Sequence, residues 1–289
     1  MMFHPGDRPI SRRVAVKSSF FGLLAVSLPR IVRAGEITAL PGPGPELFHR
    51  YPSIDDAIVA EVVGLSHFDL DKLKALVDPR PELARATWDW GFGDWESALG
   101  AASHVGRRDI AEYLMANGAR ADIFTYAMLG HHAAVKAMVD ALPGIQRTWG
   151  PHGITLLQHA RNGREGDGLT TQQRDDLDKT LAFLQSLGDA DPRPTDLEME
   201  AEEKQRYLGD YMYGDGEGDG FTVRLNMRGL LSFGRLGKFG GALYQSAPNV
   251  FAYNGTTSME VRFEVRDGNV LSLTVREPGL ELKAVKVRS

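Results

Sequence analysis

The chain contains no cysteine, and this absence removes several kinds of chemistry at once. Disulfide bonds, thiolate nucleophiles and cysteine-ligated zinc sites are all excluded. Tryptophan is scarce, with four residues among 289. No apolar run approaches the roughly 20 residues that cross a bilayer. What remains is ordinary globular composition, 43% hydrophobic and 25% charged, in a chain long enough for two packed units.

The first 34 residues resemble a bacterial twin-arginine export signal. Adjacent Arg12 and Arg13 precede a modest apolar stretch over 18–28, and Ala34 offers a cleavage point. A disordered basic tail is the alternative. We expect a signal peptide at 1–34, a spacer at 35–52, and a mature protein that resides in the periplasm or is secreted.

An excess of basic charge is missing from the rest of the chain. Residues 1–34 hold six basic residues and one acidic residue, which leaves 27 basic and 37 acidic side chains and a formal net charge of −10. No basic patch with interleaved aromatic residues is present, so we expect no nucleic-acid partner. We also expect no membrane span in the mature chain.

A periodic helical pattern fills residues 53–190. Four segments repeat apolar residues at helical spacing before a turn with glycine or proline, namely "LKALVDPRPELA", "IAEYLMANGARAD", "VKAMVDALPGIQ" and "LAFLQSLGDADP". Small-residue segments such as "SALGAASHVG" precede three of them. These segments and "YLMANGARAD" resemble ankyrin repeats, although the intervals depart from a regular period of about 33 residues. The resemblance implies an irregular α-solenoid with a concave face and finger loops.

From about Tyr207 the pattern changes to short strands separated by turns. Apolar and charged residues alternate in "SMEVRFEV", and Asp267–Gly268 forms a hairpin turn. About eight such strands in 207–289 predict a small antiparallel β-barrel. The "YLGDY" start and the hairpin "VRFEVRDGNVLSLTV" resemble the lipocalin-like barrel appended to serine β-lactamase-type hydrolases. With a helical linker at 191–206, the expected fold class is α+β.

Catalytic motifs of several families are absent from the sequence. No lysine has a serine three residues before it, as the resembled hydrolases require. Neither a G-x-S-x-G elbow nor an H-E-x-x-H helix occurs. We therefore expect no cofactor, and we favour a noncatalytic protein over an enzyme.

Two groups of residues are candidate metal ligands. Asp215, Glu217 and Asp219 resemble the start of a calcium loop, but Asn226 stands where that loop needs a bidentate glutamate. An acidic turn is the favoured interpretation. The histidines are interpreted as structural residues bonded to backbone carbonyls, with a metal site assembled across repeats as the alternative. The sequence therefore predicts no metal site.

All four tryptophans fall in the predicted finger loops. Because tryptophan is enriched in binding hot spots, we expect a protein-interaction or ligand-binding role, with these candidate contacts: Trp88, Trp90, Trp95, His104, Trp149 and His152. The expected partner is a protein or peptide, or else a small ligand. One alternative is a small-ligand carrier or hydrolase-related protein with a site in the barrel or at the domain interface. Another is that the tryptophans dock the barrel on the helices.

Overall fold

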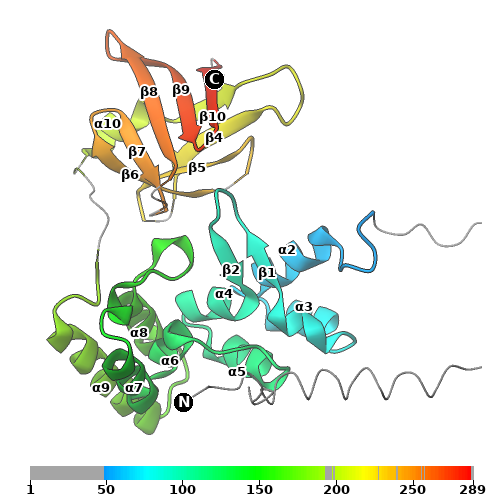
Figure 1. The fold of residues 1–289 in the computed structure, drawn as a ribbon, viewed down its shortest axis with the longest axis vertical. Helices are drawn as coiled ribbons and strands as arrows, with labels where there is room; N and C mark the ends of the chain where they lie inside the picture. Colours follow the sequence, from blue (N-terminus) through cyan, green and yellow to red (C-terminus); the bar gives the residue numbers. More distant parts are fainter. Residues whose placement is uncertain are drawn as a thin grey trace, which may run out of the picture. The chain divides into compact units, whose positions relative to one another are not determined.

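Helices occupy the first part of the described chain, and the strands of a barrel follow them (Figure 1). The computed structural model describes residues 49–192, 197, 199–226, 228–238, 240–254, 256 and 258–287. The predicted export signal and residues 35–48 of the predicted spacer lie outside the described residues. Within the described residues, no helix has the length and apolar character needed to cross a membrane.

The helical segment is built from short elements in pairs. Its α-helices are α2 (Asp56–Leu65), α3 (Leu70–Val77), α4 (Ala98–His104), α5 (Arg108–Ala116), α6 (Ile123–Leu129), α7 (His132–Ala141), α8 (Leu156–Glu165) and α9 (Thr171–Leu187). Three 3₁₀ turns accompany them, namely η1 (Pro81–Arg85), η2 (Ile145–Arg147) and η3 (Pro151–Gly153).

Side-chain caps fix where several of these helices begin. The side chains of Ser97, Asp122 and Thr155 accept hydrogen bonds from backbone N–H groups in the first turns of α4, α6 and α8. Such caps satisfy donors that a helix leaves unpaired at its start. Gly130 ends α6 in the left-handed conformation that glycine adopts without strain.

Small residues let α4, α6 and α8 pack closely. Every residue of α4 is buried. Gly163 of α8 lies so close to the Met128 carbonyl of α6 that a Cβ atom there would clash with it. One apolar core contains residues of α2, α3, α4 and α5 and extends to α6. A second core contains residues of α6, α7, α8 and α9. These contacts hold neighbouring helix pairs against one another.

Two extended loops interrupt the helices. The strands β1 (Thr87–Asp89) and β2 (Trp95–Ser97) form an antiparallel hairpin just before α4, with Trp88 opposite Glu96. A shorter loop before α8 contains η3 and is closed by a β-bridge between Trp149 and Thr155. We call residues 87–97 the hairpin and residues 149–155 the second loop.

The remaining strands form a closed antiparallel barrel, which confirms the prediction of a barrel of about eight strands and the α+β class. The strands are β3 (Gly209–Met212), β4 (Gly220–Leu225), β5 (Leu231–Arg235), β6 (Gly241–Ala247), β7 (Val250–Tyr253), β8 (Glu260–Arg266), β9 (Asn269–Glu277) and β10 (Leu280–Lys286). Neighbouring strands pair in chain order, and β10 closes the barrel on β3. The short helix α10 (Ala201–Gln205) precedes β3.

Aromatic side chains fill the barrel core. Tyr207, Tyr211, Phe233, Phe251 and Tyr253 are almost completely buried. Their hydroxyls are bonded, because Tyr207 donates to the Asn249 side chain and Tyr211 donates to the Tyr207 carbonyl. A buried tyrosine hydroxyl without a partner would destabilise the fold. The alternation seen in the sequence thus becomes a packed interior.

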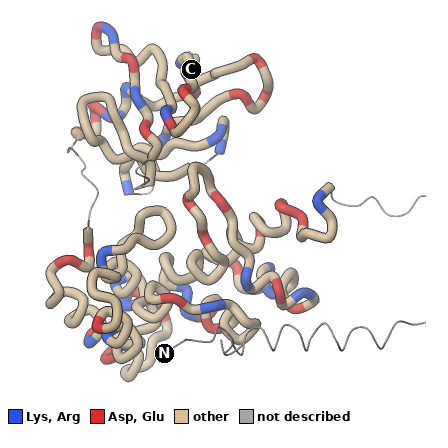
Figure 2. Tube along the Cα trace, viewed as in Figure 1, with Lys and Arg blue, Asp and Glu red and all other residues tan. Residues whose placement is uncertain are grey.

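The hairpin loop is where the helical segment contacts the barrel. Both belong to one compact unit that begins at Arg50. The ring of Phe92 lies 5.1 Å from that of Tyr253 and 6.1 Å from that of Phe233, measured between ring centroids. Acidic residues occur on both strands of the hairpin, whereas charges of both signs are interspersed over the helices and strands (Figure 2).

Candidate metal centre

Four side chains from distant parts of the sequence meet beside the hairpin. They are His67, Glu96, His104 and His152, and one ligand atom from each lies within 4.8 Å of those of the other three. Three imidazoles and a carboxylate are ligands that zinc and other first-row transition metals accept. In the part of the chain that the structure describes, this is the one cluster whose ligand atoms are close enough to share an ion.

The four members of the cluster come from four separate places in the fold. His67 follows α2, Glu96 is the central residue of β2, and His104 is the last residue of α4. His152 lies in η3 with a positive φ of 59°. Because two members lie at or just after helix ends and two lie in the hairpin and the second loop, the cluster depends on the stacking of the helices and on both extended loops.

Glu96 is the centre of the cluster. It has no exposed surface. Its Oε1 lies 3.0 Å from His104 Nε2 and 3.3 Å from His152 Nε2, and its Oε2 lies 3.4 Å from His67 Nε2. Two ligands bound tetrahedrally at about 2.0–2.1 Å from one zinc ion are themselves roughly 3.3 Å apart. The separations between Glu96 and the three imidazoles therefore fit ligands of a single ion.

Two atoms of the cluster have no hydrogen-bond partner. Glu96 Oε1 and His104 Nε2 are buried and unsatisfied, although they face each other at 3.0 Å. A buried polar atom that is left unpaired costs about 1–3 kcal/mol. A metal ion bound between these atoms would satisfy both.

The outer contacts orient two of the imidazoles. His67 Nδ1 lies 3.0 Å from the Gly64 carbonyl oxygen and 3.1 Å from that of Val63. His152 Nδ1 lies 2.7 Å from Asp94 Oδ2. Because carbonyls and carboxylates only accept, each Nδ1 must donate, and the lone pair of neutral imidazole then sits on Nε2, facing the cluster. Metal-binding histidines show this arrangement of outer hydrogen bonds.

The charge state of Glu96 is set by its neighbours. Burial would raise the pKa of this carboxyl, but the adjacent imidazoles of His104 and His152 outweigh burial and hold its pKa well below the ordinary value. Glu96 is therefore ionised at neutral pH. A further hydrogen bond of 2.7 Å from Trp90 Nε1 to Oε2 leaves Oε1 as the oxygen nearest His104 and His152.

The two buried imidazoles beside Glu96 differ in their environments. Burial lowers the pKa of His104. Burial also acts to lower the pKa of His152, but the contacts of this residue with Asp94 and Glu96 prevail and raise it to about 10. Without an ion, His104 is therefore neutral and His152 is protonated at neutral pH. An ion bound at His152 Nε2 would displace the proton from that atom.

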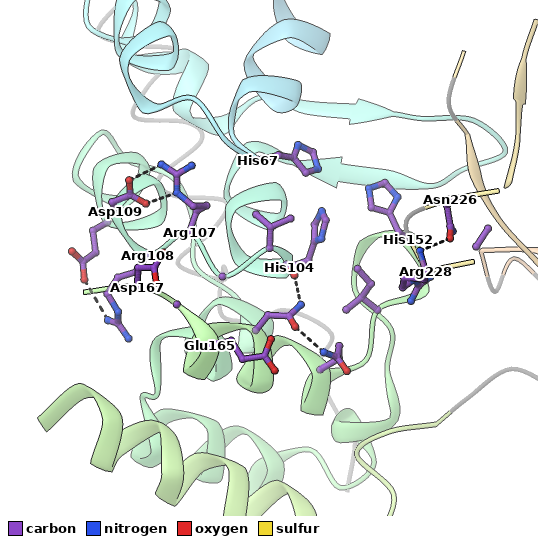
Figure 3. A pocket seen from close by; sticks show the side chains of 18 of the residues that line it. His67, His104, Arg107, Arg108, Asp109, His152, Glu165, Asp167, Asn226 and Arg228 are labelled. Atoms are coloured by element: carbon purple, nitrogen blue, oxygen red, sulfur yellow. Dashed lines mark hydrogen bonds and ion pairs between the residues drawn. The ribbon is translucent and has the colours of Figure 1, made fainter. Parts of the chain in front are cut away.

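The cluster lies on the wall of a large pocket. The pocket has a volume of about 1430 Å³ and is lined by helical residues and by barrel residues such as Arg228 and Asn254. Figure 3 shows the rings of His67, His104 and His152 grouped at this wall, with the Arg107–Asp109 pair farther along it. The pocket gives a ligand access to the cluster.

The structure brings together some of the residues that the sequence singled out. His104 and His152 are in the cluster, and Trp90 contacts it through Glu96. Trp88 packs against the helical core, and Trp149 donates a hydrogen bond to the Pro192 carbonyl. Trp95 is 63% exposed. Of the candidate contacts, His104, His152 and Trp90 meet at the cluster.

Other predicted residues lie elsewhere. Asp215 and Glu217 are exposed in the loop between β3 and β4, and Asp219 accepts a hydrogen bond from the Gly216 N–H within that turn. His159 donates through Nδ1 to the Thr155 carbonyl, as the sequence interpretation of structural histidines expects. The sequence interpretation overlooked His67 and Glu96. The local signal for them was α4, a helix of small buried residues that ends at His104. A buried histidine needs a polar partner, so such a partner must lie nearby.

Comparison of the chain with protein-family models, with curated proteins and with solved structures finds no match.

Proposed function

We propose that the chain binds a divalent transition-metal ion through His67, Glu96, His104 and His152 and uses it to hold a small oxygen-donor ligand in the adjoining pocket. The observation that carries this proposal is the unsatisfied pair of buried atoms, Glu96 Oε1 and His104 Nε2, within a set of four potential ligands. A purely structural cluster would be expected to satisfy its buried polar atoms. The three imidazoles favour zinc, iron, cobalt or nickel over magnesium or calcium.

The pocket supports a ligand-binding role for the ion. Its polar and apolar lining and its volume of about 1430 Å³ accommodate a small molecule. A bound ion acts as a Lewis acid towards a carbonyl, carboxylate or phosphoryl oxygen. This proposal corresponds to the alternative of a small-ligand protein with a site where the two parts of the chain meet.

The experiment is metal binding by the full chain after treatment with a chelator. Titration with Zn²⁺ in a calorimeter and with Co²⁺ in an absorption spectrometer should give one ion per chain. His104→Ala should lose the ion, while His131→Ala should retain it, because His131 is an exposed histidine outside the cluster. Failure of the wild-type chain to bind either ion would refute the proposal.

Small anions test whether the bound ion accepts a further ligand. Azide or acetate should change the visible spectrum of the Co²⁺ form, because an ion with four protein ligands that faces the pocket would expand to five-coordination when it binds the anion. An unchanged spectrum at high anion concentration would mean a closed, structural ion. The metal-binding part of the proposal would then stand, and the ligand-binding part would be wrong.

We also propose that the helical segment is an ankyrin-type array. The hairpin before α4, the second loop before α8 and the pairing of α4 with α5, α6 with α7 and α8 with α9 support this arrangement. In it, the loops that carry Glu96 and His152 are fingers of the repeats. A protein or peptide partner and an exported location stay predictions.

A further inference from the structure

The tip of the hairpin has an unusual backbone. Gly91, Phe92 and Gly93 have φ angles of 129°, 57° and 81°. A positive φ is uncommon for a residue other than glycine, and a bulky residue there adopts it at a cost. The cost falls on Phe92, so other contacts must hold the tip in this shape.

Asp89 supplies some of those contacts by accepting hydrogen bonds from the Gly91 and Gly93 N–H groups, and the barrel supplies others. The Phe92 ring packs against Phe233 and Tyr253 in the barrel core. The Tyr253 hydroxyl is fixed in turn by accepting a hydrogen bond of 3.0 Å from the Gly241 N–H. The loop between the two strands of the hairpin is therefore shaped by residues that lie about 140 positions or more farther along the chain.

A second barrel contact reaches Asp94. Asn254 donates from Nδ2 to Asp94 Oδ2 at 2.6 Å, and both residues are buried. The amide orientation is defined, because Asn254 Oδ1 accepts a hydrogen bond from the Ala242 N–H. Asp94 also accepts two hydrogen bonds from His152, one from the backbone N–H and one from Nδ1.

We propose that the barrel forms part of the outer shell of the metal centre, with Asn254 acting as a positioning residue for His152 through Asp94, and Phe92 holding the hairpin that carries Glu96. The inference rests on the proposed metal function. It predicts that metal affinity depends on barrel residues that touch no ligand atom. In this proposal the barrel supports the metal centre, and no ligand has to bind inside the barrel.

Asn254→Asp tests the first contact with little other change. Aspartate tolerates the positive φ of 42° at this position and retains an oxygen for the Ala242 N–H, but it replaces the donor that faces Asp94 with a second acceptor. Loss of an outer hydrogen bond to a metal ligand typically lowers metal affinity by about 10–100-fold. We expect a loss in this range for Zn²⁺, together with an altered visible spectrum of the Co²⁺ form.

Asn249→Asp is the matched control. Asn249 lies in the same barrel, has a positive φ of 60° and accepts a hydrogen bond from Tyr207 rather than contacting Asp94. Its Zn²⁺ affinity should stay within about twofold of the wild type. In an Asp94→Asn background, Asn254→Asp should change the affinity by less than about threefold, because the contact through which it acts is already altered.

Phe92→Gly tests the contact between Phe92 and the barrel core. This test holds even if Asn254→Asp does not fold. Glycine accepts the left-handed backbone, so the change removes the ring without adding strain. We expect a loss of Zn²⁺ affinity of about 10-fold. Circular dichroism of every variant establishes that the folded chain is being compared.

The outcomes separate the two proposals. If the wild type binds Zn²⁺ and both Asn254→Asp and Phe92→Gly bind it within twofold of the wild type, the barrel has no part in the centre and this inference is wrong, while the metal function stands. If the wild type binds no ion, both proposals fail. If Asn254→Asp does not fold, the Phe92→Gly affinity alone decides.

Discussion

The helical segment and the barrel bury their polar groups in opposite ways. The barrel core holds tyrosines whose hydroxyls bond to backbone groups, as Tyr211 does with the Tyr207 carbonyl and Tyr253 with the Gly241 N–H. The helical segment buries Glu96 completely beside three histidines. Burying charge is costly unless it is well paired, whereas an aromatic core stabilises a fold directly. The barrel interior therefore contributes to stability, and the helical cluster is the part of the molecule for which we propose a function.

The largest predicted effect separates barrel stability from the metal centre. Phe251 is almost completely buried and packs its ring against Tyr207 and Phe263, but it makes no ring contact with Phe92. Phe251→Ala should lower the free energy of unfolding of the barrel by about 3–5 kcal/mol. The affinity of the folded chain for Zn²⁺ should stay within about twofold of the wild type.

Urea denaturation followed by circular dichroism measures this loss. Leu271→Ala is the control, because Leu271 is a barrel residue that is 38% exposed. Its effect should be near 0.5 kcal/mol or less. If Phe251→Ala weakened Zn²⁺ binding as much as Asn254→Asp does, barrel variants would act on the centre by destabilising the fold in general, and not through the contact between Asn254 and Asp94.

A second prediction concerns pH and the polar interior of the helical segment. Burial lowers the pKa of His159 from 6.5 to about 4. The unfolded chain therefore binds more protons than the folded chain between these pH values, and the free energy of unfolding falls as the pH falls from 6.5 to 4. The difference in pKa corresponds to a loss of about 3 kcal/mol from this residue.

The comparison that isolates this effect is His159→Asn, which keeps a donor for the Thr155 carbonyl. The variant should be less stable at pH 7, but its urea midpoint should decline less steeply between pH 6.5 and pH 4 than that of the wild type. Parallel declines would show that His159 does not contribute to the acid sensitivity of the helical segment.

A third prediction compares two acidic residues of the hairpin. Glu96→Gln should lower the affinity for Zn²⁺ by at least about 100-fold, or about 2.7 kcal/mol, since it removes the anionic ligand and exceeds the usual loss for an outer-shell residue. Asp89→Asn should change it little, because Asp89 is used in hydrogen bonds to the Gly91 and Gly93 N–H groups and does not reach the cluster. Isothermal titration of the chelated proteins measures both, and equal losses would contradict the assignment.

The smallest predicted effect concerns two tryptophans of the hairpin. Trp90→Phe keeps an aromatic ring but removes the indole donor to Glu96 Oε2. We expect Zn²⁺ affinity to fall by about 10-fold. Trp95→Phe should leave the affinity unchanged, because Trp95 is exposed. An unchanged affinity in Trp90→Phe would mean that this hydrogen bond does not orient the carboxylate.

The barrel could be predicted from the sequence because its signal is local. Alternating residues such as those of β8 and the turn at Asp267–Gly268 each specify a strand or a hairpin within a few positions. The closed order of eight strands follows from successive hairpins, which need no long-range information beyond the final pairing of β10 with β3.

The candidate metal centre could not be predicted in the same way. His67, Glu96, His104 and His152 have no motif spacing, because separate elements carry them and the stacking of the helices brings them together. His104 and His152 attracted attention as residues of the repeats and fingers, whereas His67 lies at a helix end without any pattern around it. The role of Asn254 depends on where the barrel contacts the hairpin, which no local sequence pattern encodes.

X-ray absorption spectroscopy of the full chain loaded with one equivalent of Zn²⁺ tests the central claim most directly. The account predicts about three imidazole ligands and a carboxylate oxygen at roughly 2.0–2.2 Å from the ion, with the imidazole signal reduced in His104→Ala. A zinc ion surrounded only by oxygen ligands, or a spectrum unchanged by His104→Ala, would contradict it.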